Sequence, residues 1–85
     1  MSSIRIAGVL FAIYSHDHLP RHAHASYGGA LVIVEFDENN AWVRDHRGAV
    51  QPANAKRADV TRILKLALEN LVTLNGIWEG VHGKE

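Results

Sequence analysis

Four of the six histidines lie within nine residues that read HDHLPRHAH, from His16 to His24. Imidazole titrates near neutral pH, and its neutral nitrogen binds transition metals. The candidate metal ligands are His16, His18, His22, His24 and Asp17. Zinc or another divalent transition metal accepts imidazole and carboxylate ligands. Because the chain has no cysteine, thiolate sites and disulfides are excluded, and any metal must be held by these two groups.

The same segment suits a second chemistry, metal-free acid–base catalysis. The candidate catalytic residues are His18, His22, His24 and Asp17. Two histidines on either side of a phosphodiester can act as base and acid, and Arg21 can bind the phosphate through two hydrogen bonds. A small ribonuclease would use such a set. A third interpretation is structural, in which these side chains only hydrogen-bond backbone groups of a proline-containing loop.

The elements around the cluster decide whether its rings converge. If HAHAS forms a strand, His22 and His24 point to one side and the intervening alanines point to the core. Pro20 restricts its own backbone and that of the preceding residue, which favours a tight loop before this strand. A turn there would bring His16 and His18 beside the second pair.

The remaining pattern predicts strands first and then a helix. SIRI, VLFAIY, ALVIVEF and AWVRDH are alternating or rich in β-branched and aromatic residues, as strands are. ALVIVEF is apolar at nearly every position, which favours a strand that is buried on both sides or central in a sheet. The segment RGAVQPANA is expected to be a loop.

Apolar residues at steps of three and four predict a helix over about 55–80. They are Val60, Ile63, Leu64, Ala67, Leu68, Leu71, Leu74 and Trp78. Asn75 and Gly76 are expected to weaken or end this helix, because glycine is the usual C-terminal stop. Trp78 is expected in the core and Trp42 on a sheet face, whereas His46 and His82 are expected at the surface.

These elements predict one α+β domain over residues 1–85. It has a small antiparallel sheet of about four strands, at about 3–46, and one long C-terminal helix packed on one face. A chain of 85 residues buries only a little over ~60% of its unfolded surface. A partner chain or a bound metal can therefore matter for its stability, and unpaired sheet edges favour a homodimer.

The net charge is zero, but the charge is unevenly distributed. Residues 44–65 carry six basic and two acidic side chains, a local net charge of +4. This asymmetry favours an anionic partner, with Arg44, Lys56, Arg57 and Arg62 as candidate contacts to nucleic acid or a protein. The alternative is a solvated helix face, since a dedicated nucleic-acid module is usually basic overall.

The apolar run over residues 7–14 is about half as long as a membrane span requires. No small-residue cleavage site of a signal peptide follows it. The sequence therefore predicts a cytoplasmic protein without a membrane partner.

The segment IYSHDHLPRHAHASYGG closely resembles the signature of a small bacterial family known only as domain of unknown function number 4160. That signature has an aromatic residue, a polar residue, D-H-x-P-x-H-x-H, and a glycine pair after another aromatic residue. The matching positions are Tyr14, Ser15, Asp17, His18, Pro20, His22, His24, Tyr27, Gly28 and Gly29. The resemblance extends to a C-terminal helix ending in tryptophan and histidine, here IWEGVHG, and His16 falls outside the family core.

The family has no settled activity, so the resemblance implies no particular reaction for this protein. Its members look like stand-alone cytosolic proteins, often encoded beside another small protein and sometimes labelled toxin–antitoxin components. The resemblance thus supports a regulatory or interaction protein with a small protein partner, such as one half of a toxin–antitoxin-like pair, and it also keeps a nuclease open. The alternative is a hydrolase, either metal-assisted or a histidine acid–base ribonuclease.

Overall fold

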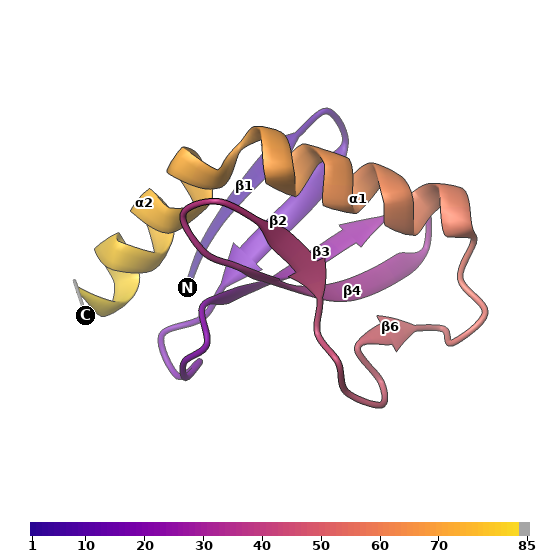
Figure 1. The fold of residues 1–85 in the computed structure, drawn as a ribbon, viewed down its shortest axis with the longest axis horizontal. Coiled ribbons are helices and arrows are strands. Elements are labelled where there is room, and N and C mark those ends of the chain that lie inside the picture. The colour runs from indigo at the N-terminus through magenta and orange to yellow at the C-terminus, as the bar shows by residue number, and fades with distance from the viewer. Residues whose placement is uncertain (84–85) are drawn as a thin grey trace.

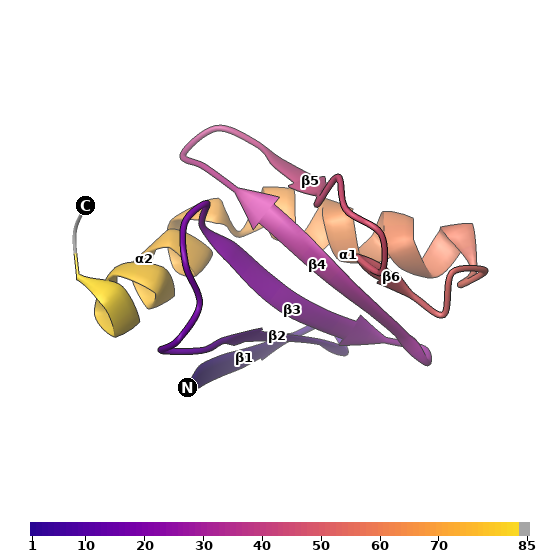
Figure 2. The ribbon, with the colours of Figure 1, turned by 90° about the horizontal axis from the view of Figure 1, so that it is seen from below.

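The computed structural model describes residues 1–83, and its architecture is α+β, as predicted. Six strands form one antiparallel sheet, and two helices run across one of its faces (Figures 1 and 2). The strands are β1 (Ser2–Ile6), β2 (Val9–Ile13), β3 (His22–Tyr27), β4 (Ala30–Phe36), β5 (Ala41–Val43) and β6 (Val50–Gln51). Lys84 and Glu85, which the predicted domain includes, lie outside the described residues.

The strands lie side by side in the order β1-β2-β3-β4-β5. β6 pairs with the first half of β4, on the same side of β4 as β5, which pairs with its second half. The sheet is larger than the predicted four strands and extends to Gln51, past the predicted limit at residue 46. Part of this difference in strand number is β6, which forms within RGAVQPANA, the segment that was expected to be a loop. The Ile33 amide and the Ala49 carbonyl form a hydrogen bond of 2.8 Å, which helps to hold this segment on β4.

Of the two positions predicted for ALVIVEF, the central one is confirmed. β4 pairs with β3 on one side and with β5 and β6 on the other. Only its helix-covered face is fully buried: Val32 and Val34 have no exposed surface, whereas Leu31 is 42% exposed. The helices cover a single face, so the opposite face of the strand keeps contact with solvent.

Two helices, α1 (Arg57–Glu69) and α2 (Leu71–His82), replace the single long helix that was predicted. Their buried side chains pack on the sheet; they are Ile63, Ala67, Leu74 and Trp78. The break falls at Asn70, with φ −129° and ψ 31°, and not at Asn75 and Gly76. The Asn70 side-chain amide donates to the Leu66 carbonyl at 2.8 Å, the local backbone competition that disfavours asparagine inside helices. Neither helix, within residues 1–83, is long and apolar enough to cross a membrane.

Asn75 and Gly76 lie inside α2 and should have opposite effects on stability. The Asn75 amide donates to the Leu71 and Asp37 carbonyls and accepts from Arg21. A Cβ atom at Gly76 would meet no atom within 4 Å. We expect Gly76→Ala to raise the free energy of unfolding by about 0.5–1 kcal/mol. Asn75→Ala should lower it by about 1–2 kcal/mol, because Arg21 loses a partner. Urea unfolding measures both, and a shift of the same sign in the two variants would contradict this account.

Candidate functional site

β3 presents two histidines on the same side, as predicted. Ala23 and Ala25 are fully buried in the core, and the rings of His22 and His24 approach Asp17. Asp17 lies in the loop between β2 and β3, where a short turn holds it. Its Oδ2 atom accepts a hydrogen bond from the Tyr14 amide at 3.0 Å, and its own amide donates to the Tyr14 carbonyl at 3.1 Å. The carboxylate is therefore fixed by backbone on one side and faces imidazole on the other.

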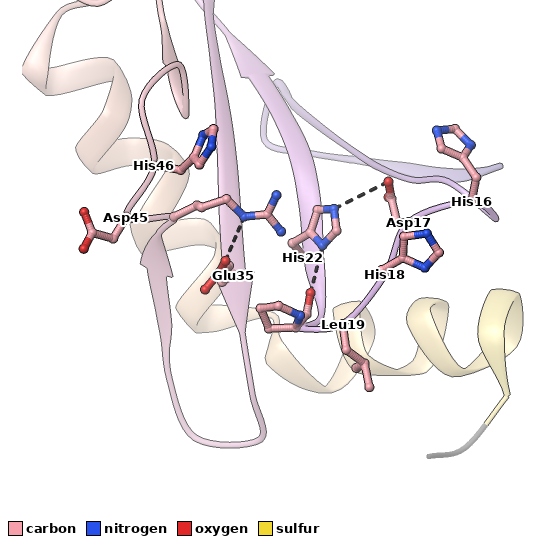
Figure 3. A pocket seen from close by; sticks show the side chains of 10 residues that line it. His16, Asp17, His18, Leu19, His22, Glu35, Asp45 and His46 are labelled. Atoms are coloured by element: carbon pink, nitrogen blue, oxygen red, sulfur yellow. Dashed lines mark hydrogen bonds and ion pairs between the residues drawn. The ribbon is translucent and has the colours of Figure 1, made fainter.

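Asp17, His22 and His24 form a convergent group, here called the triad. Asp17 Oδ1 lies 3.5 Å from His22 Nε2 and 3.4 Å from His24 Nε2, and the ligand atoms of all three lie within 4.8 Å of one another. Figure 3 shows the His22 ring directed toward Asp17. Atoms about 2.0–2.1 Å from a tetrahedral zinc ion are roughly 3.3 Å apart. The two distances to Asp17 therefore suit a shared metal ion.

The tautomer of a neutral His22 ring follows from the contact that its second ring nitrogen makes. His22 Nδ1 lies 2.9 Å from the carbonyl oxygen of Pro20. Because a carbonyl oxygen only accepts, Nδ1 carries the proton, and Nε2 of the neutral ring presents a lone pair. That lone pair points at the Asp17 carboxylate, so two acceptors face each other. A cation between them, either a proton or a metal ion, removes this repulsion.

The carboxyl group of Asp17 is in the form that binds metal. Burial raises the pKa of Asp17, but the hydrogen bond from the Tyr14 amide and the interactions with His22 and His24 outweigh burial. Together they hold the pKa of Asp17 below its ordinary value. The group is therefore ionised at neutral pH, as metal binding requires.

The other predicted ligands do not join the triad. His16 and His18 are both exposed. Among the described residues, the group that can hold a metal contains neither of them. The His16 ring lies 5.7 Å from the Tyr14 ring, and His18 borders an open groove beside the triad. Figure 3 shows both rings turned away from His22. The H-x-H spacing is the same in both pairs, but only the second pair lies in a strand.

His82 is half-buried, which corrects its expected place at the surface, whereas His46 is exposed as predicted. The His82 ring stacks on Trp78 with centroids 3.8 Å apart, and its Nε2 lies 3.0 Å from the Tyr14 carbonyl. Trp78 in turn lies 5.8 Å from the His22 ring. The end of α2 thus braces the turn that holds Asp17. The four-residue spacing of Trp78 and His82 could have indicated their contact from the sequence, since it places both side chains on one helix face.

The four candidate contact residues lie in different parts of the fold. Arg44 donates from Nε to Glu35 Oε2 at 2.8 Å, near the end of β4. Arg62 of α1 donates to the Ala7 carbonyl and lies 5.2 Å above the Tyr27 ring. The other two, Lys56 and Arg57, are exposed at the start of α1. Arg44 therefore lies beside the triad, apart from the three basic residues around α1.

Glu35 should make stability depend on pH. Burial raises the pKa of Glu35, but its other interactions, led by the hydrogen bonds from Arg44 and Trp42, together lower it by more than burial raises it. The pKa of Glu35 therefore lies below its ordinary value. Because the pKa of Glu35 is lower in the folded state than in the unfolded state, its ionised form stabilises the protein at pH values above the unfolded-state pKa of ~4.3. This stabilisation is lost as the pH falls through the folded-state pKa. We expect Glu35→Gln to cost about 1.5 kcal/mol at pH 7 and less at pH 3. Urea unfolding at both pH values measures this difference. Exposed Glu38→Gln serves as control, and a cost that does not change with pH would contradict the expectation.

Comparisons with known proteins identify no relative of this chain from which the role of the site could be inferred. No family model matches the chain, no curated protein matches it, and no solved structure matches it. The resemblance of residues 14–29 to the family numbered 4160 therefore stays a prediction. The same holds for the toxin–antitoxin-like role that the resemblance implies.

Proposed function

We propose that Asp17, His22 and His24 bind a divalent transition-metal ion, with zinc as the first candidate. The observation that carries this proposal is the convergence of His22 Nε2 and His24 Nε2 on one oxygen of the Asp17 carboxylate, at 3.5 and 3.4 Å, while His22 Nδ1 is bound to the Pro20 carbonyl. Two imidazoles and one carboxylate suit zinc and other transition metals, whereas calcium and magnesium prefer oxygen ligands alone.

Three protein ligands leave a fourth position open for water or substrate, as catalytic zinc sites do. A zinc ion held by Asp17, His22 and His24 would lower the pKa of a water molecule to about 7 and so would supply a nucleophile for hydrolysis. This supports the metal-assisted hydrolase among the alternatives from the sequence. The role of the chain is to orient the ligands: Pro20 fixes the His22 ring, and the Tyr14 amide fixes Asp17.

The metal-free ribonuclease suits this geometry less well. Such an enzyme needs two imidazoles on opposite sides of a phosphodiester. Here both Nε2 atoms lie 3.4–3.5 Å from one Asp17 oxygen. A phosphate between the rings would have to displace the carboxylate, which the Tyr14 amide holds in place.

A role as a regulatory or interaction protein stays a prediction that is compatible with this proposal. Metal binding couples to folding, because the ligands are not preassembled in the unfolded chain. An ion on the triad would therefore stabilise a small domain and, with it, any surface that meets a small protein partner or a second copy.

Metal titration of the metal-free protein tests the proposal. We expect zinc to bind with a micromolar or tighter dissociation constant by calorimetry, since the ligands are already positioned. Nitrogen-15 NMR should show the Nε2 signals of His22 and His24 shifting together, with those of His16 and His18 unchanged. Cobalt, bound in place of zinc, should give the visible absorption of a low-symmetry site. Millimolar binding, or binding that leaves the two Nε2 signals unmoved, would overturn the proposal.

A further inference from the structure

A groove of about 510 Å³ opens beside the triad. Its lining includes Asp17 and His22 of the triad, Glu35 of β4, and Arg44, Asp45 and His46 of the segment after β5. Figure 3 shows His46 and Asp45 across the groove from Asp17, with His22 and Glu35 between them. A molecule in the groove would contact two triad residues and the segment after β5 together.

Arg44 is held rigidly at the wall of this groove. Its amide donates to the Ile33 carbonyl at 3.0 Å, and its Nε donates to Glu35 Oε2 at 2.8 Å. The second oxygen of Glu35 accepts from Trp42 Nε1 at 2.9 Å. Glu35 also lies directly opposite His22 in the β3–β4 register. Glu35 therefore positions the guanidinium close to the triad.

The outer edge of the Arg44 guanidinium is available to a ligand. Within residues 1–83, no hydrogen bond involves its two terminal NH2 groups, and the side chain is 25% exposed. These two groups form a planar fork that matches two oxygens of one phosphate or carboxylate group. Because Glu35 already fixes Nε, a ligand on the fork would need little further ordering of the side chain.

The neighbourhood favours phosphate over carboxylate. A carboxylate has two oxygens, and both would be turned toward the fork of Arg44. A phosphate group offers further oxygens to the exposed imidazoles of His18 and His46, which border the same groove. A divalent ion on the triad would add positive charge beside these groups.

We infer that Arg44 forms a phosphate-binding subsite, and that the groove takes a substrate carrying a phosphate group beside the metal site. The position of this substrate next to a metal ion rests on the proposed metal binding, whereas the phosphate subsite depends only on Arg44 and its surroundings. The substrate class that fits this site is a phosphate ester.

Inorganic phosphate is the probe, titrated by calorimetry into metal-free protein and into protein holding one equivalent of zinc. We expect phosphate to bind both forms, more tightly to the zinc form. Arg44→Met should weaken phosphate binding roughly 10–100-fold in each form, the effect of losing a bidentate charged contact. Arg44→Lys keeps a charge for Glu35 and so should fold, but it lacks the fork and should also bind weakly. Arg47→Met, an exposed arginine outside the groove, should bind as the wild type does.

The outcomes separate the two proposals. If zinc binds but phosphate affinity is the same in Arg44→Met and Arg44→Lys as in the wild type, the subsite is overturned and the metal site stands. If phosphate binding depends on Arg44 in a protein that does not bind zinc, the metal proposal fails and the subsite is supported. Acetate, titrated in parallel, should bind more weakly; acetate binding as tight as phosphate would overturn the phosphate assignment.

Discussion

Replacing His22 with alanine is expected to weaken zinc binding by at least about 100-fold. Changes to groups that merely orient metal ligands typically cost 10–100-fold in affinity, so the loss of a ligand itself should reach the upper end or exceed it. His24→Ala should have a similar effect. Competition with a chromophoric chelator measures these affinities, including those too tight for direct calorimetry.

The chain supplies matched controls in the same loop. His16→Ala and His18→Ala remove exposed imidazoles outside the triad, and both should leave zinc affinity within about twofold of the wild type. His22 is buried and hydrogen-bonded to Pro20, so His22→Ala can also affect folding. Asp17→Asn keeps the shape of the side chain and provides an independent loss of a ligand. Loss of zinc binding in His18→Ala, together with its retention in His22→Ala and Asp17→Asn, would show that the ligand set is wrong.

Replacing Trp78 with alanine is expected to lower the free energy of unfolding by about 3–5 kcal/mol. Trp78 is only 1% exposed and lies in the core cluster. Its ring also contacts His82 and approaches His22, so it joins α2 to the strand that carries the triad. A domain with about 5–15 kcal/mol of total stability would lose a large part of it.

Trp42 is the natural control, because it is 38% exposed on the sheet face away from the helices. Trp42→Ala should cost about 1–2 kcal/mol, from its partly buried area and its hydrogen bond to Glu35. Urea unfolding followed by far-ultraviolet circular dichroism measures both variants without relying on tryptophan fluorescence. Trp78→Phe retains most of the ring volume and should fall between wild type and Trp78→Ala. Equal losses in the two alanine variants would contradict the assigned place of Trp78 in the core.

The local pattern predicted the part of the site that lies in a regular element. HAHAS alternates between imidazole and alanine, and a strand places every second side chain on the same face. Ala23 and Ala25 are in the core for this reason, and His22 and His24 share the other side. The α+β class followed in the same way, from strand-like segments before a helical apolar stripe.

The choice of ligands within the cluster required the tertiary structure. Both histidine pairs have the spacing H-x-H, so the spacing alone does not distinguish them. The turn that joins Asp17 to Tyr14 directs the carboxylate toward β3 and leaves His16 and His18 in solvent. The Pro20 carbonyl that orients His22 is likewise a backbone group, and residue types do not reveal its direction.

By itself, the sequence determined which side chains alternate along a strand or repeat along a helix, because periodicity depends only on local backbone geometry. The tertiary structure alone decided which separate segments meet. It brings His82 against the Tyr14 carbonyl across 68 positions, and it pairs Arg44, just after β5, with Glu35 of β4. It also brings Asn75 of α2 against Arg21, which lies 54 positions earlier in the chain. These contacts depend on how the sheet, loops and helices pack, and no local pattern encodes that packing.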